Sequence, residues 1–323
     1  MSSTYLLFAI ILSPAVFAVF LLLTPARHKA VQAGLMLGGF GLNLVFNALA
    51  YGKEIYLSMP WGIADIDFSL RLYPLSGFIL MSASVLSLLV AVYTTAFLAG
   101  KRCAKPFYSG MLITIALVNG AVLSNNLAVM LFFWEGILGT LFTLILLGGE
   151  RAYPTSIKAV VIAGLTDLCM MLGIGIVGHL AGTLAMDRIR LPLDNGLSVA
   201  AFALLMIGAA SKAGAIPFHT WIPDAADDAP MPFLAFLPGT LEKLLGIYLA
   251  ARICLDLFEF EHGTPLSYLI MTLGAVTILL AVMMALIQKD YKRLLSYHAI
   301  SQVGYMLLGI GTALPIGIAG GLF

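Results

Sequence analysis

The sequence predicts an all-α, polytopic membrane bundle of about 10–11 transmembrane helices, and three observations lead to this fold class. Of the 323 residues, 61% are hydrophobic and only 10% are charged, with a mean hydropathy of +1.02. A soluble domain carries roughly a quarter charged residues. Apolar runs of about 20 residues, long enough to cross a bilayer, recur along the whole chain, and one is interrupted near 213–217.

The apolar runs place the spans in chain order. The expected bounds are 5–23, 30–50, 75–99, 108–124, 126–147, 159–182, 197–217, 232–255, 266–287 and 294–313, and a further span begins near Pro315. Many spans follow the first run and no small-residue cleavage site does, so we expect a retained helix rather than a cleaved signal. Polar Asn125 and Asn126 divide the fourth span from the fifth. The loops near 52–72 and 184–196 contain Pro, Gly and Asp, and we expect short turns or hairpins there.

The basic residues of alternate loops predict the orientation, because Lys and Arg concentrate on the cytoplasmic side. One set of loops holds Arg27, Lys29, Lys101, Arg102, Lys105, Arg151, Lys158, Lys289, Lys292 and Arg293; the other holds Lys53, Arg71, Arg188, Arg190 and Arg252. We therefore expect a multi-pass protein of the inner (cytoplasmic) membrane with its N-terminus outside. The acidic loop that carries Asp224 would then face the cytoplasm.

Several function classes are excluded by composition. A net charge of +1 is too small for electrostatic binding to the phosphates of a nucleic acid. Cys103, Cys169 and Cys254 lie far apart and make no C-x-x-C motif, so the thiolate sets of iron–sulfur clusters and structural zinc are missing. No Gly-rich nucleotide fingerprint follows a strand-like segment. We expect no metal, no cofactor and no catalytic residue in this chain.

Two lysines, Lys212 and Lys243, fall inside apolar surroundings that should span the bilayer. An ammonium in hydrocarbon costs several kcal/mol, so each is a candidate functional residue. Gly214 and Pro217 directly follow the first lysine and should break its helix. Broken helices at membrane depth occur only where protein buries them or a watery cavity adjoins them.

Buried acids are candidate partners for these lysines. Glu135 lies about nine residues into its span, which at ~1.5 Å per residue is near the bilayer midplane. Desolvation favours its protonated form unless a cation stands beside it; it is either a proton carrier or a structural ion-pair partner. Asp167, also deep in an apolar helix, could pair with Lys212 or bond to neighbouring helices. Glu242 points roughly 100° away from Lys243 around the helix, which leaves its role open.

Three further groups lie near the expected cytoplasmic ends. His298 falls about one turn inside the boundary, where it is either a relay between water and a buried lysine or an interfacial side chain. His219 and Asp224 would lie at the cytoplasmic mouth. They could line a proton uptake path or fix the loop by hydrogen bonds, and the second reading is slightly favoured.

The run KAGAIPFHTWIPDA from Lys212 to Ala225, with Lys243 following, resembles the antiporter-like subunits of respiratory complex I. The same family includes Mrp-type cation/proton antiporters and the large membrane subunits of energy-converting NiFe hydrogenases. Phe133-Trp134-Glu135 resembles the family's glutamate-bearing helix, and the run DYKRLLSY at 290–297 resembles its DxKRLLAY segment. The run DAPMPFLAFLPGTLEKLLGIYLAAR and His298 are most similar to the Ech-like and CO-dependent hydrogenase branch.

This resemblance implies a role in proton translocation, with Na⁺ as the alternative ion. Glu135 would pair with Lys212, Lys243 would pass the proton laterally, and Asp167 matches an acidic position of some members. The chain would be N-terminal helices at 1–107, a first inverted repeat at 108–255 and an incomplete second repeat at 266–323. The distal Lys or Glu is missing, so either a separate polypeptide completes the repeat or the sequence belongs to a longer chain.

The resemblance also implies partners. We expect a non-catalytic, ion-translocating subunit among other membrane subunits, with peripheral Fe–S and NiFe or quinone-reactive subunits carrying the electron chemistry. The alternatives are a complex I subunit, an Mrp-type antiporter subunit, and a membrane scaffold that does not pump.

Overall fold

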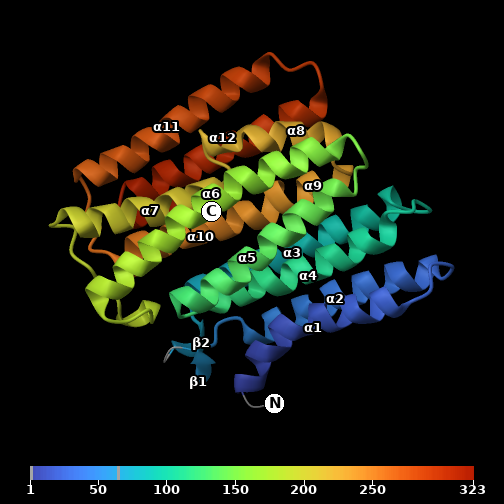
Figure 1. Cartoon of the computed structure of the whole chain (residues 1–323), viewed down its shortest axis with the longest axis horizontal. Coiled ribbons are helices and arrows are strands. Elements are labelled where there is room, and N and C mark those ends of the chain that lie inside the picture. Colours follow the sequence, from blue (N-terminus) through green and yellow to red (C-terminus); the bar gives the residue numbers. More distant parts are fainter. Residues whose placement is uncertain (1–2, 64–65) are drawn as a thin grey trace. The chain divides into compact units, whose positions relative to one another are not determined.

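The computed structural model describes residues 3–63 and 66–323 and is a polytopic helical membrane bundle (Figure 1). Within those ranges, nine helical segments are long and apolar enough to cross a membrane. They are Thr4–Leu23, Lys29–Ala50, Pro74–Phe97, Ala104–Leu123, Leu127–Leu146, Ala152–Ala181, Gly196–Asp228, Met231–Leu257 and Pro265–Leu286. The expected span at 294–313 is α12 (Tyr291–Gly311), which has the length of a span but is more polar than the nine. The segment after Pro315 forms α13 (Pro315–Leu322), which is 8 residues long.

The helices group into two compact units. The first comprises Met1–Ser156 and Ala229–Leu241. Its elements are α1 (Ser3–Leu23), α2 (Lys29–Ala50), β1 (Ile55–Ile63), β2 (Ile66–Leu72), α3 (Pro74–Phe97), α4 (Ala104–Leu123), α5 (Leu127–Leu146), α9 (Met231–Phe236) and a π-helical turn at Leu237–Leu241. Helix α4 is the core of this unit, because α1, α2, α3 and α5 all contact it.

A proline explains one buried polar contact in this core. Pro14 lies inside α1 and has no N–H, so the carbonyl of Ile10 lacks its usual helical donor. The side-chain amides of Asn43 on α2 and Asn119 on α4 each donate to that carbonyl at 3.0 Å. Hydrogen bonds of this kind join membrane helices where no hydrophobic force between them exists. The three helices are therefore tied together at one freed backbone oxygen.

The loop predictions for this unit are confirmed. Strands β1 and β2 form an antiparallel hairpin in which Ile55 pairs with Leu72. The division after the fourth span is also confirmed, since α4 ends at Leu123 and Asn126 caps α5 by accepting a hydrogen bond from the Ala128 N–H at 2.9 Å.

The second unit comprises Ile157–Asp228 and Glu242–Phe323. It contains most of α6 (Ala152–Ala181), then α7 (Gly196–Ala213), α8 (Trp221–Asp228), α10 (Glu242–Arg252), a π-helical turn at Ile253–Leu257, α11 (Pro265–Leu286), α12 and α13. Helix α7 packs on α10, α10 and α8 pack on α12, and α12 pairs with α11 along its length (Figure 1). The loop near 184–196 contains a 3₁₀ turn at Met186–Arg188, as its composition predicts.

The predicted helix break is confirmed. Helix α7 ends at Ala213, a 3₁₀ turn covers Phe218–Thr220, and α8 resumes at Trp221. Gly214 has φ of 89°, a left-handed conformation that glycine adopts without the steric cost of a Cβ. The predicted repeat boundaries concern internal symmetry and stay a prediction.

Candidate functional site

The site in the second unit begins with the way α7 ends. The N–H of Gly214 donates to the carbonyl of Ser211, and the N–H of Ala215 donates to the carbonyl of Ala210, each at 2.9 Å. These two bonds are the Schellman pattern that a C-terminal glycine makes possible. Lys212 therefore occupies the last turn of a helix that stops inside a candidate span, and its side chain is buried, with 4% of its surface exposed. A cation in a last turn is favoured by the helix dipole.

Helix α6 brings an acid to the level of Lys212. The hydroxyl of Thr166 donates to the hydroxyl of Ser211 across the α6–α7 contact at 2.8 Å. Asp167 directly follows Thr166 on α6, and Lys212 directly follows Ser211 on α7. Asp167 is buried, with 2% of its surface exposed. Asp167 therefore lies near the level of Lys212 on a neighbouring helix, and its pairing with Lys212 stays a prediction.

Helix α10 supplies a second acid. Glu242 is 2% exposed and lies within electrostatic range of both Lys212 and Asp167. The backbones of α7 and α10 can approach this closely because Gly246 has no side chain: a Cβ there would lie 2.5 Å from the Ala213 nitrogen. Glu242 therefore lies beside the broken helix, and its role stays open.

Lys243 faces a different helix from its neighbour Glu242. Its Nζ donates to Oε1 of Gln302 on α12 at 2.8 Å, and the lysine is 6% exposed. Sequence reasoning missed Gln302. The signal was present, because Gln302 follows the candidate His298 by four residues and so shares its face of α12. The His298 side chain itself is exposed, and its relay role stays a prediction.

Asp224 belongs to a separate charge cluster on α6, α8 and α12. Its carboxylate pairs with Lys158 at 2.7 Å and with Arg293 at 3.1 Å. Arg293 also contacts Asp227 at 2.8 Å. This is the arrangement expected of a residue that fixes the chain after the break. The ring of His219 lies 6.3 Å from that of Tyr297; its part in an uptake path stays a prediction.

Glu135 lies on α5 in the first unit and is half-buried. Its predicted pairing with Lys212 joins residues of different units, so it also stays a prediction. Within the described residues, no group of three or more His, Cys, Asp or Glu side chains could hold a metal ion.

The family model described as NADH:quinone oxidoreductase/Mrp antiporter, TM, matches residues 124–323, which include every candidate residue above. The chain belongs to this NADH:quinone oxidoreductase/Mrp antiporter family. The resemblance drawn from the motifs is confirmed at this level.

Curated relatives in this family come from several kinds of complex. The chain is 28% identical to an Na(+)/H(+) antiporter protein of Alkalihalophilus pseudofirmus, covering 97% of this chain and 65% of that protein. It is 29% identical to hydrogenase-4 component B of Escherichia coli, covering 79% and 38%, and 29% identical to an NADH-quinone oxidoreductase protein of Desulforudis audaxviator, covering 81% and 53%. The chain thus spans between about a third and two thirds of the length of these relatives.

Solved structures share the fold. A chain of the archaeal membrane-bound sulfane sulfur reductase superposes with a TM-score of 0.82 at 25% identity, covering 97% of this chain and 52% of that one. A chain of the Mrp complex from Dietzia sp. superposes with a TM-score of 0.87 at 22% identity, covering 100% and 35%. The chain is an antiporter-like subunit in fold and family, and these similarities do not single out the hydrogenase branch.

Proposed function

We propose that this chain translocates protons, with Na⁺ as the alternative ion, as a non-catalytic subunit of a larger membrane complex. The observation that carries the proposal is the buried cluster of Lys212, Asp167 and Glu242 beside a broken membrane helix. Ionisable residues inside a membrane are costly, and they mark ion and proton pathways.

The cluster can store and release a proton because its charges depend on one another. Glu242 lies within electrostatic range of Lys212 and of Asp167. The ammonium offsets part of the desolvation cost of a carboxylate, whereas the two carboxylates disfavour each other's charged form. When a proton reaches Asp167 or Glu242, Lys212 loses a counter-charge, and its burial then favours the neutral amine. The proton that Lys212 releases would pass toward Lys243. The break after Ala213 frees backbone carbonyls and admits the water that such a transfer needs.

Lys243 and Gln302 continue the path on the other face of α10. The Gln302 amide cannot carry a proton itself at neutral pH, but it holds the Lys243 ammonium toward α12. His298, one turn away, is accessible, and histidine is the residue type that suits proton exchange with water near neutral pH. Glu135, by family resemblance, would be the switch that a partner subunit moves toward or away from Lys212.

The host complex we favour is a ferredoxin-linked, energy-converting NiFe hydrogenase, in which Fe–S and NiFe subunits do the electron chemistry. The motif at 228–252 and His298 support this choice, and the similarity to hydrogenase-4 component B is compatible with it. The complex I alternative has equal support from the NADH-quinone oxidoreductase relative.

An Mrp-type cation/proton antiporter is the second candidate function. The specific observation is that similarity to the Na(+)/H(+) antiporter relative extends over 97% of this chain. Such an assembly would exchange Na⁺ for protons without any redox partner.

Purification of the native complex, followed by reconstitution in vesicles, separates these candidates. A redox complex would contain Fe–S subunits and acidify or alkalinise the lumen only when an electron donor is supplied. An antiporter would move protons in response to a Na⁺ gradient alone. If vesicles that hold the intact complex show neither of these activities, the proposal is contradicted and the chain is left as a scaffold.

A further inference from the structure

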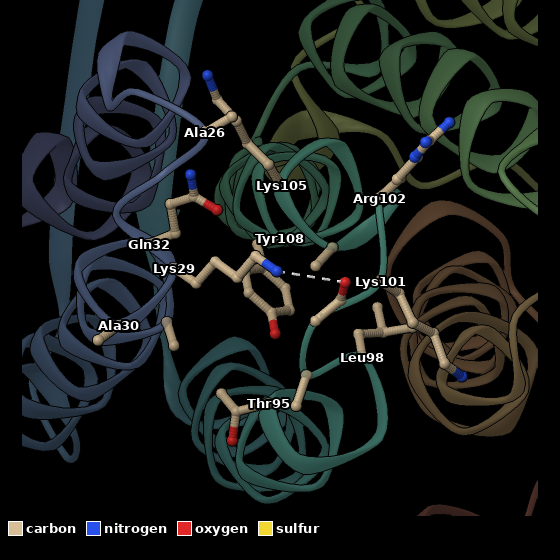
Figure 2. Close-up of a pocket in the computed structure, with 14 residues that line it drawn as sticks. Ala26, Lys29, Ala30, Gln32, Thr95, Leu98, Lys101, Arg102, Lys105 and Tyr108 are labelled. Carbon is tan, nitrogen blue, oxygen red and sulfur yellow. Dashed lines mark hydrogen bonds between the residues drawn. The ribbon is translucent and has the colours of Figure 1, made fainter.

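A hollow in the first unit is lined by none of the proton-handling residues (Figure 2). It has a volume of about 420 Å³ and lies where α2 begins, α3 ends and α4 begins. Four of its 14 lining residues are basic and none is acidic. The basic residues are Lys29, Lys101, Arg102 and Lys105. A cavity with this lining attracts an anion.

Lys29 is the basic residue that reaches across the hollow. Its Nζ donates to the carbonyl of Gly100 at 3.4 Å, a long bond that a stronger acceptor could replace. Figure 2 shows its ammonium group near the middle of the hollow, directed toward that carbonyl. The charged ends of Lys105, Arg102 and Lys101 point outward from the edge of the hollow in Figure 2, and that of Lys101 lies over the Phe97 ring at 3.9 Å.

These basic side chains are available to a ligand. Among the residues that the structure describes, no ion pair joins Lys29, Arg102 or Lys105 to a carboxylate. Helices α2 and α4 both start beside the hollow, and neither His28 nor Cys103 caps them with a side-chain hydrogen bond. Their first-turn N–H groups add positive potential to the four side chains.

The position of the hollow indicates what kind of anion fits. All three helices are candidate spans, and their ends meet the level at which lipid headgroups lie. The rest of the lining includes small apolar side chains, among them Ala30, Ala33 and Leu98, which suit a glycerol backbone and the first methylenes of an acyl chain. The volume falls in the range of sites for organic ligands rather than single ions.

We propose that this hollow binds the phosphate headgroup of an anionic phospholipid. The orientation expected from the loop charges puts it in the cytoplasmic leaflet, where anionic lipids are enriched and basic pockets between helix ends recognise them. Lys29 would bind the phosphate inside the hollow, and the positive charges of Lys105 and Arg102 at its edge would attract the headgroup. Zwitterionic lipids would bind less tightly because their own ammonium group opposes the basic lining.

Photo-crosslinking tests the proposal on the chain purified with the subunits that accompany it. The protein is placed in phosphatidylcholine nanodiscs with a trace of photoreactive phosphatidylglycerol, and labelled peptides are counted by mass spectrometry. The test variant is Lys29→Gln with Lys105→Gln. The charge-matched control is Lys53→Gln with Lys289→Gln, two exposed lysines outside the hollow. Lys29→Arg with Lys105→Arg keeps the charges and checks that the site still folds.

We expect phosphatidylglycerol to label peptides around 26–33 and 98–108, and photoreactive phosphatidylcholine to label them much less. Each lysine near a headgroup contributes roughly fivefold in binding, so the glutamine pair should lose on the order of 20-fold in labelling. The control and arginine pairs should keep it. Undiminished labelling in the glutamine pair, or equal labelling by phosphatidylcholine, would overturn the proposal. Displacement of the lipid by millimolar inorganic phosphate would also overturn it, in favour of a free-phosphate site.

Discussion

Glu242→Gln tests the buried cluster most directly, because it removes one negative charge with almost no change in volume. Glu242 and Asp167 are each 2% exposed, Lys212 is 4% exposed, and Glu242 lies within electrostatic range of both. With Asp167 still present, Lys212 keeps one counter-charge, so we expect the single variant to fold and to lose at least tenfold in proton pumping. The loss arises because a glutamine at this position cannot take up the proton whose arrival makes Lys212 release its own.

The double variant Glu242→Gln with Asp167→Asn shows how much stability the two acids contribute by pairing with Lys212. Leaving a buried charge without its partners costs roughly 3–5 kcal/mol unless the group becomes neutral. The effects on stability of substituting two residues that share a partner do not simply add. The double variant should therefore lose more thermal stability than the sum of the losses in the two single variants. Glu259→Gln, a half-exposed acid in the same unit that lies 3.8 Å from Arg190, is the matched control and should change little.

The assays are proton uptake in vesicles and thermal unfolding in detergent, measured on the same preparations. Strictly additive losses of stability would mean that Asp167 and Glu242 do not share Lys212. Full pumping by Glu242→Gln would remove Glu242 from the mechanism even if the stability result held.

Three further predictions follow from single contacts. Lys243→Ala should abolish ion pumping while electron transfer or partner binding persists, and Lys243→Arg should fail nearly as badly because arginine keeps its proton; full pumping by the alanine variant would refute the relay. Gly246→Ala should lower the free energy of unfolding by about 1–3 kcal/mol, because the added methyl overpacks against α7, and the unfolding temperature should fall. Gly196→Ala is the control and should be neutral, because a Cβ there meets no atom within 4 Å. Asp224→Asn should lower the free energy of unfolding by no more than about 2 kcal/mol, because its two ion pairs are partly solvated. This loss of stability should be smaller in high salt, which screens the ion pairs. A loss that salt leaves unchanged would argue for a packing role instead.

Local signals account for much of what was predicted. The membrane class follows from composition, and the spans follow from the lengths of apolar runs. The break after Lys212 follows from Gly214, whose left-handed conformation ends a helix wherever that helix lies. Asn126, which divides two spans and caps α5, acts on a backbone group two residues away. Each of these features depends on neighbours in the sequence, which is why the sequence reveals it.

The sequence alone therefore determined that buried lysines and acids lie in the membrane beside a broken helix, because the desolvation cost of a charge in an apolar run requires no knowledge of the fold. Only the tertiary structure decided which of them meet. Glu242 approaches Lys212 because Gly246 lets α10 come close to α7, and Lys243 reaches Gln302 because α12 packs on the adjacent face. Two neighbouring residues on one helix point about 100° apart, so the rotation of α10 between its neighbours assigns each a partner. That rotation is set by side-chain packing along the whole helix, which no local pattern specifies.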